Sequence, residues 1–210
     1  MCATRFTFAP ATAARWRDVE RLFGPRGACA GCWCMWWRIP RSRFDREKGE
    51  KNKRALRAIV TSGAAPGILA YAGGEPAGWC AVAPRETYPV LARSRTLARV
   101  DDAPVWSVTC FFIARAHRRR GLSVRLLRAA VEHARKHGAR VVEGYPIEAR
   151  TANYAAAWAW TGFTGTFLKA GFREVLRRSS TRPIMRRIIA GRRTGAASRA
   201  APAGGRTRQR

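Results

Sequence analysis

The clearest hydrophobic pattern in the chain lies between residues 104 and 138. Residues 105–113 (VWSVTCFFI) carry no charge and are rich in β-branched and aromatic side chains, which indicates a buried strand. After a short basic turn, apolar residues recur at helical spacing, at Leu122, Leu126, Leu127, Ala130, Val131 and Ala134. Gly138 then offers a natural helix end. The pattern predicts a strand, a turn and a helix around which the rest of the chain is organised.

Hydrophobic periodicity predicts further elements on both sides of this unit. Helices are expected at 12–23, at 44–62 and at 159–170, the first with Trp16, Val19, Leu22 and Phe23 near one face. Strands are expected at 66–72 and 76–83, joined by a tight turn at Gly73-Gly74. Later strands are expected at 139–147, 175–178 and 184–189. Segment 85–104 has the composition of a surface excursion with one short helical piece.

The order of these elements predicts the fold class. A strand, a crossover helix and a second strand favour parallel pairing of 105–113 with 139–147. The expected fold is α/β (α+β), with a mixed central β-sheet flanked by helices. From Ala190 onward the chain is mostly Gly, Ala, Arg, Ser and Thr without an apolar period, which is typical of disorder. The sequence therefore predicts one domain at 1–190 and a disordered basic tail at 191–210.

The turn before the central helix carries the strongest chemical signal. Three consecutive arginines, Arg118, Arg119 and Arg120, stand where a helix N-terminus already has positive character. Like charges there are unfavourable unless an anion sits among them. Gly121 would let the main chain approach such an anion, and Ser123 would add a small hydroxyl. The turn therefore predicts a phosphate site, with a solvated basic turn as the alternative.

Charge changes this picture because arginine is abundant along the whole chain. The 210 residues carry a formal net charge of +28, which predicts attraction to polyanions such as nucleic acids and coenzymes. A nonspecific basic surface and a nucleic-acid-binding protein are therefore kept as alternatives. No apolar run is long enough for a membrane span and the N-terminal residues lack a secretory h-region. We expect a cytoplasmic protein, without membrane association and with reduced cysteines.

The segment 28–38 (ACAGCWCMWWR) allows three interpretations. Cys29, Cys32 and Cys34 resemble part of a zinc site, but a second pair is missing and the histidines lie far along the chain, so no metal is expected. The segment can instead be a strand or turn whose side chains pack into the core. In the third interpretation, Trp36 and Trp37 line a pocket for an acceptor molecule.

The order Arg118-x-x-Gly121-x-Ser123 between a strand and a helix resembles the signature of the GNAT acetyltransferases, Arg/Gln-x-x-Gly-x-Gly/Ala. Ser123 departs from the usual small Gly or Ala. The element order over roughly residues 5–189 is also similar to the GNAT fold. The segments CWCMWWR, GWCAVAPRE, WSVTCFFI and RPIM resemble a poorly described subgroup of that family.

The resemblance implies an acyl-CoA-dependent N-acetyltransferase that uses acetyl-CoA as cosubstrate. Its acceptor would be a primary amine of a small molecule or peptide. The implied coenzyme site comprises Phe111, Phe112, Ile113, Arg118, Arg119, Arg120, Gly121, Leu122 and Ser123. A tyrosine that protonates the leaving thiolate in the family falls on Phe167, which has no proton to give. Tyr145 and Cys110 are possible substitutes, and solvent is another.

Two carboxylates are candidate catalytic residues. Glu143 lies on the strand after the central helix, beside the place where the strands of the family diverge, and is the first candidate for the general base. The alternative for Glu143 is an ion pair with an arginine. Glu86, after the predicted hairpin, is the second candidate. His117 and Trp160 are interpreted as a solvated loop histidine and a packing residue. A catalytically inactive acyl-CoA sensor stays open, and so does the oligomeric state, with a dimer compatible.

Overall fold

The computed structural model describes residues 5–149 and 159–189. Its strands are β1 (Phe6–Pro10), β2 (Gly67–Ala72), β3 (Glu75–Pro84), β4 (Trp106–Ile113), β5 (Val141–Gly144), β6 (Arg173–Arg177) and β7 (Pro183–Ile188). Its α-helices are α1 (Trp16–Phe23), α2 (Arg41–Arg46), α3 (Glu50–Thr61), α4 (Pro89–Ala92), α5 (Leu122–Lys136) and α6 (Thr164–Lys169). The predicted tail at 191–210 lies outside the described residues.

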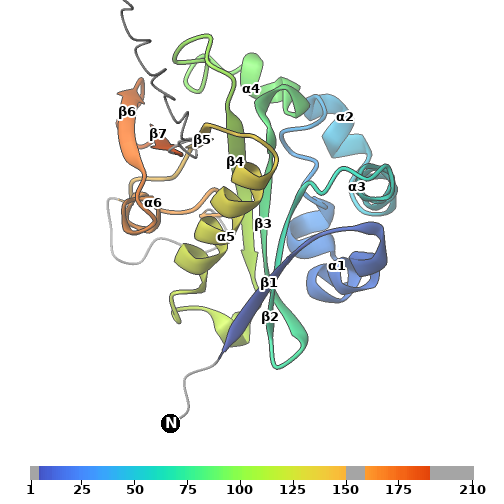
Figure 1. Ribbon diagram of the computed structural model, residues 1–210. Helices are drawn as coiled ribbons and strands as arrows, with labels where there is room; N and C mark the ends of the chain where they lie inside the picture. Colours follow the sequence, from blue (N-terminus) through green and yellow to red (C-terminus); the bar gives the residue numbers. More distant parts are fainter. Residues whose placement is uncertain (1–4, 150–158, 190–210) are drawn as a thin grey trace, which may run out of the picture.

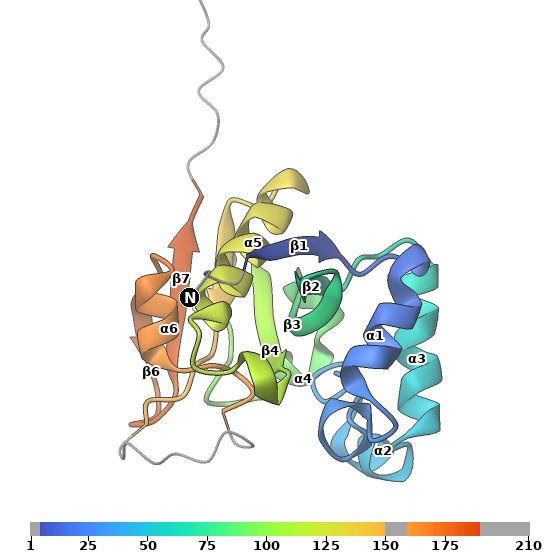
Figure 2. The same ribbon diagram turned by 90° about the horizontal axis from the view of Figure 1, so that it is seen from below.

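The strands form one sheet in the order β1-β2-β3-β4-β5-β7-β6. Every neighbouring pair is antiparallel except β4 and β5, which run parallel as predicted from the crossover helix between them. α5 and α6 cover one face of the sheet, and α1, α2 and α3 lie on the other side (Figures 1 and 2). The predicted mixed sheet flanked by helices is confirmed.

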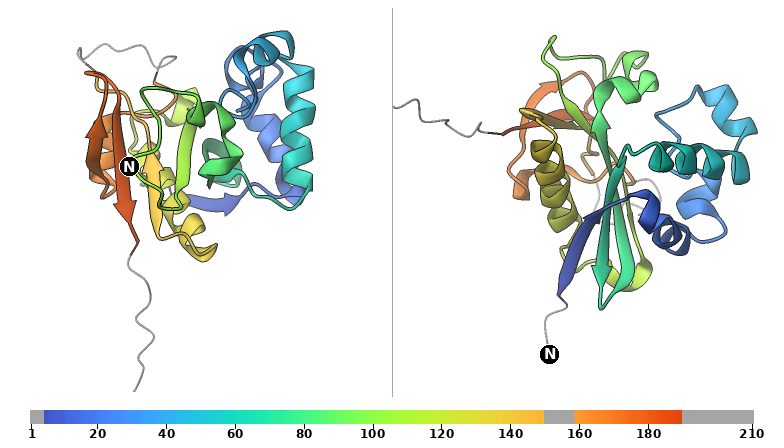
Figure 3. Two further views of the ribbon diagram at one scale, coloured as in Figure 1. Left: turned by 90° about the horizontal axis from the view of Figure 1, so that it is seen from above. Right: turned by 45° about the vertical axis from the view of Figure 1, so that its right-hand side comes forward.

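Each face of the sheet has its own apolar core. Leu122, Leu126 and Leu127 of α5 pack with Val108 and Phe167 in one cluster. Trp16, Val19, Leu22 and Phe23 of α1, all buried as predicted, pack with Leu56, Val60 and Trp79 in a second cluster. The views in Figure 3 show the β6–β7 end of the sheet and the layer of α1 to α3 on opposite sides of the central strands.

Several predicted elements differ from the structure. The N-terminal strand β1 was not predicted, although it pairs with β2 over its whole length. The helix expected at 44–62 is divided into α2 and α3, because Gly49 has a φ of +84° and its N–H donates to the carbonyl of Gly31. The helix expected at 159–170 begins only at Thr164.

The segment 85–104 is also more than a surface excursion. Tyr88, Leu91 and Leu97 are buried in a third apolar cluster that also contains Tyr145. Arg85 is buried as well, and it donates to the carbonyl of Leu97 over 2.7 Å. The segment 85–104 therefore packs against Tyr145, which follows β5, and supplies the buried positive charge of Arg85 there.

Candidate functional site

The parallel strands β4 and β5 pair over only three positions. Trp106, Ser107 and Val108 lie opposite Val142, Glu143 and Gly144, after which the strands separate. Thr109 follows as an extra residue in β4, because Ala81 of β3 pairs with Cys110 while Val82 pairs with Val108. Such a bulge bends its strand. Beyond it, the N–H of Phe111 donates to the carbonyl of Trp160 over 2.6 Å, so another segment borders β4 where β5 has diverged.

A cavity of about 1230 Å³ lies at this divergence. Its wall contains residues from both sides of the sheet, namely Arg118, Arg119 and Ser123 near the start of α5 and Arg41, Phe44 and Lys48 on and after α2. The end of β4 and the segments 28–37, 147–149 and 159–166 supply other lining residues. The cavity therefore joins the basic turn to the opposite face of the sheet.

The basic turn reaches the cavity through part of the predicted set. Phe111, Phe112, Ile113, Arg118, Arg119 and Ser123 line it, whereas Arg120, Gly121 and Leu122 are not among the lining residues. Arg118 donates from Nε to the carbonyl of Ile113 over 2.9 Å, which folds it back onto β4. Leu122 is buried in the core and anchors the start of α5.

The start of α5 has the backbone geometry of an anion site. Gly121, at the N-cap, adopts a left-handed conformation with φ +71°, and no side chain caps the helix. The first turn of the helix holds no acidic residue. A Cβ added at Gly121 would meet no atom within 4 Å, so the space beside it is open. Main-chain N–H groups at such a helix start favour a phosphate or carboxylate.

Three tryptophans form an aromatic wall on the other side of the cavity. Trp36 and Trp37 come from the segment after Cys34, and the ring of Trp160 lies 5.6 Å from the first and 5.9 Å from the second. All three line the cavity. The interpretation of Trp36 and Trp37 as pocket residues agrees with this placement. The interpretation of Trp160 as a packing residue of a final helix was wrong, because Trp160 precedes α6 and faces the cavity; Trp158 lies outside the described residues.

Four thiols also line the cavity, those of Cys29, Cys32, Cys34 and Cys110. The sulfur atoms of Cys34 and Cys110 lie 3.5 Å apart. Burial raises the pKa of Cys32 to about 12 and that of Cys34 well above its usual value, so both remain thiols. Within the described residues, no group of three or more His, Cys, Asp or Glu side chains could hold a metal ion.

Glu143, the first candidate for the general base, is not among the lining residues of the cavity. Its carboxylate is fully buried, accepting from Nη1 of Arg85 over 3.0 Å and from Nε of Arg186 over 2.7 Å. The hydroxyl of Tyr145 also donates to it, over 2.7 Å. The alternative of an ion pair with arginine therefore describes Glu143.

Glu86, Tyr145 and His117 are not among the lining residues of the cavity either. Glu86 is exposed and pairs with Arg99 over 2.6 Å. Tyr145 is buried beside Arg85 and Ser107, and desolvation raises its pKa well above the usual value. His117 packs edge-on against Phe6 and is half-buried, which corrects its interpretation as a solvated residue. Of the two proposed substitutes for the missing tyrosine, only Cys110 lines the cavity.

Sequence reasoning missed Glu148, the one carboxylate among the described residues that line the cavity. It follows β5 by a few residues, and its side chain is 42% exposed. Arg177 of β6 donates to it over 2.5 Å and to Glu174 over 2.6 Å, so one guanidinium serves two carboxylates. The signal available in the sequence was the placement of Glu148 just after a strand that borders the predicted divergence.

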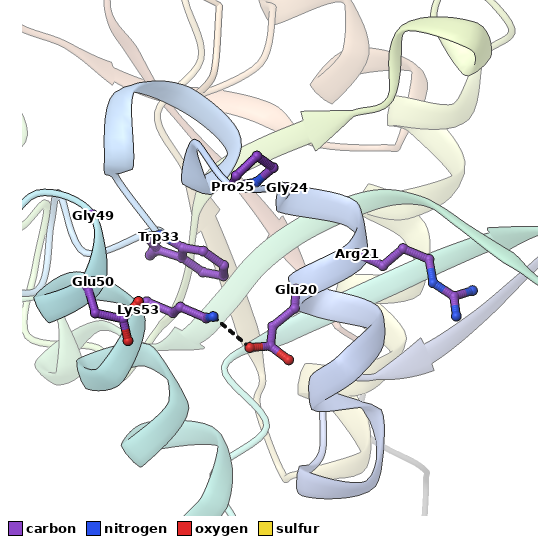
Figure 4. Close-up of a pocket in the computed structure, with 8 residues that line it drawn as sticks. All are labelled: Glu20, Arg21, Gly24, Pro25, Trp33, Gly49, Glu50 and Lys53. Atoms are coloured by element: carbon purple, nitrogen blue, oxygen red, sulfur yellow. Dashed lines mark ion pairs between the residues drawn. The ribbon is translucent and has the colours of Figure 1, made fainter.

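A second hollow of about 550 Å³ lies between α1 and α3 (Figure 4). Lys53 and Glu20 form an ion pair of 2.8 Å across it, and Nζ of Lys53 lies 5.5 Å from the centre of the Trp33 ring. Arg21 and Glu50 also line the hollow, so its charges balance. The residues that line this hollow carry no surplus charge, and none of them belongs to the basic turn. The hollow is therefore not part of the candidate site.

Comparison with known proteins agrees with the fold. The chain is similar to the structure of an acetyltransferase of the GNAT family from Listeria monocytogenes, with a TM-score of 0.55 and 10% identity over 90% of this chain and 99% of that one. It is also similar to one from Streptococcus agalactiae, with a TM-score of 0.52 and 14% identity over 89% and 96%. No curated protein matches the sequence. No helix in the described part of the chain is long and apolar enough to cross a membrane.

The model of the acetyltransferase (GNAT) family matches residues 33–161, which is more than half of the chain. The matched range contains β4, the basic turn, α5 and β5, together with Glu148 and the three tryptophans of the cavity wall. The chain therefore belongs to the acetyltransferase (GNAT) family.

Proposed function

We propose that the protein transfers the acetyl group of acetyl-CoA to a primary amine. One observation carries this proposal: a single cavity joins the basic turn at the start of α5 to an aromatic wall on the opposite face of the sheet. The anionic cosubstrate would enter along the first side and the amine along the second. Their reacting atoms would then meet where β4 and β5 diverge.

The basic turn is the proposed site for the phosphates of the cosubstrate. Arg118 and Arg119 line the cavity and would form charge-assisted contacts, while Gly121 keeps the main chain open at the start of α5. Arg120 would add positive potential and Leu122 fixes the helix in the core. The chain of the cosubstrate would then follow Phe111, Phe112 and Ile113 along the end of β4 that lines the cavity.

Glu148 is the proposed general base. The nitrogen of the acceptor attacks the thioester carbonyl, the tetrahedral oxyanion collapses, and the coenzyme leaves as a thiolate. An acceptor that enters as an ammonium ion loses one proton before it attacks and a second as the amide forms, and Glu148 is the cavity carboxylate that could receive the first, directly or through a water. The thiolate takes up a proton in turn, from the thiol of Cys110 or from solvent. Main-chain N–H groups of β4 past the bulge, other than that of Phe111, which donates to Trp160, are candidates for stabilising the oxyanion.

The test measures free thiol released from acetyl-CoA in the presence of a panel of primary amines, with mass spectrometry of the products. We expect at least one amine to gain an acetyl group at the rate of thiol release. Calorimetry with acetyl-CoA, repeated from low to high salt, would accompany it. Coenzyme binding should decline gently with salt, whereas binding of DNA through scattered arginines should collapse. Absence of coenzyme binding at every salt concentration would overturn the proposal in favour of a nucleic-acid-binding protein.

A further inference from the structure

The acceptor side of the cavity carries a surplus positive charge. Arg41 of α2 and Lys48 both line the cavity, and both pair with Asp45, over 2.7 and 2.9 Å. Two cations thus share one carboxylate, and Asp45 itself is not among the lining residues. Because one positive charge remains unbalanced at this rim, it attracts an anionic group and repels a polycationic acceptor.

Arg41 is held in a position suited to receive such an anion. Its guanidinium carbon lies 3.9 Å from the centre of the Trp36 ring, and its pairing with Asp45 uses Nε. Within the described part of the chain this is its one hydrogen bond, so the N–H groups of Nη1 and Nη2 stay available. A guanidinium whose orientation is fixed by a ring and a carboxylate can bind a second carboxylate with little further loss of entropy.

The aromatic wall lies next to this charge. Trp36 is in edge contact with both Phe44 and Trp160, with ring centres 5.1 and 5.6 Å apart. Trp37 and Phe163 extend the same wall. Flat apolar surfaces of this kind bind planar rings by stacking and edge contacts. Glu148, the one carboxylate among the described lining residues, is where the amine would lose its proton.

We propose that the acceptor is an aromatic amine that also bears a carboxylate, the chemistry of an aromatic amino acid. The ring would lie on the wall of Trp36, Trp37 and Trp160, and its carboxylate would pair with Arg41. The amine would face Glu148 and the thioester. This inference rests on the proposed function, since it names the substrate class of the same cavity.

Matched pairs of amines test the role of the carboxylate. Phenylalanine and phenethylamine differ by that group alone, as do tryptophan and tryptamine, and spermidine supplies a polycation. We expect kcat/KM to be about tenfold or more higher for each amino acid than for its decarboxylated partner, because a charge-assisted contact is lost. Arg41→Gln should erase this preference by lowering kcat/KM for the amino acid while leaving phenethylamine within about twofold.

Arg43→Gln is the matched control. Arg43 lies on the same helix and pairs with Glu47 at the same spacing, over 2.9 Å, but it is not among the lining residues of the cavity. It should leave the preference unchanged. Equal or faster acetylation of the decarboxylated amines, or of spermidine, would overturn the inference while the proposed function stands. Failure of every amine in the presence of bound acetyl-CoA would count against the proposed function itself.

Discussion

Glu143 and Glu148 lie close together along the chain, yet their surroundings are opposite. The Glu143 side chain is 1% exposed and is held by Arg85, which follows β3, and by Arg186 from β7. The Glu148 side chain is 42% exposed, faces the cavity and shares one arginine with Glu174. Up to Gly144 the strand is paired on both sides, whereas after it the chain borders the divergence. The comparison teaches that pairing of β5 on both sides encloses Glu143 in buried ion pairs, whereas the end of that pairing leaves Glu148 at the cavity.

The largest effect is expected from Glu143→Gln. The substitution would leave Arg85 and Arg186 without their shared counterion in a buried site, and removal of one partner of a buried pair costs about 3–5 kcal/mol. Urea unfolding followed by tryptophan fluorescence would measure the loss. A variant that keeps the wild-type free energy of unfolding but loses turnover would reverse the roles that the comparison assigns to the two carboxylates.

A smaller loss is expected from Arg118→Ala combined with Arg119→Ala. Both side chains line the cavity, and each charge-assisted contact is worth about 1.5–3 kcal/mol, so acetyl-CoA affinity should fall at least tenfold. Calorimetry measures this directly. Arg115→Ala provides the control, because Arg115 is exposed in the same basic segment but is not a lining residue. An equal loss in the control would indicate a diffuse effect of charge instead of a site.

The smallest effect is expected from Glu86→Gln. Glu86 pairs with Arg99 at the surface, where such pairs contribute about 0–1 kcal/mol and are screened by salt. Unfolding free energy and turnover should both stay close to wild type. A large loss of turnover with the fold intact would return Glu86 to the list of catalytic candidates and weaken the contrast drawn above.

The strand, turn and helix between residues 104 and 138 were predicted well, because the spacing of apolar residues indicates which side of a helix or strand is buried. The spacing of Leu122, Leu126 and Leu127 and the uncharged strand before them gave the crossover unit and its parallel pairing. The division of the helix at Gly49 could not be predicted, since it depends on a contact of Gly49 with Gly31. The strand β1 was missed because it is only five residues long and is defined by its pairing with β2, a distant segment of the chain.

The site was predicted in part for the same reason. The residues of the basic turn are consecutive in the sequence, so the sequence alone was enough to identify them. The surroundings of Glu143 depend on Arg85 and Arg186, which come from distant segments, and an arginine-rich composition gives no indication of which arginine will pair. Glu148 reaches the cavity because β5 ends at Gly144, earlier than predicted. Trp160 reaches it because α6 begins only at Thr164, later than predicted. Tertiary placement, not residue type, decided these roles.

The most direct test measures kcat for Glu148→Gln beside Glu174→Gln, since both carboxylates bind Arg177 but only Glu148 lines the cavity. Glu148→Gln should lower kcat about 100-fold, a typical contribution of a general base, with acetyl-CoA affinity and unfolding free energy unchanged. Glu174→Gln should turn over normally. Wild-type kcat in Glu148→Gln, or an equal loss in Glu174→Gln, would contradict the assignment of Glu148 as the base.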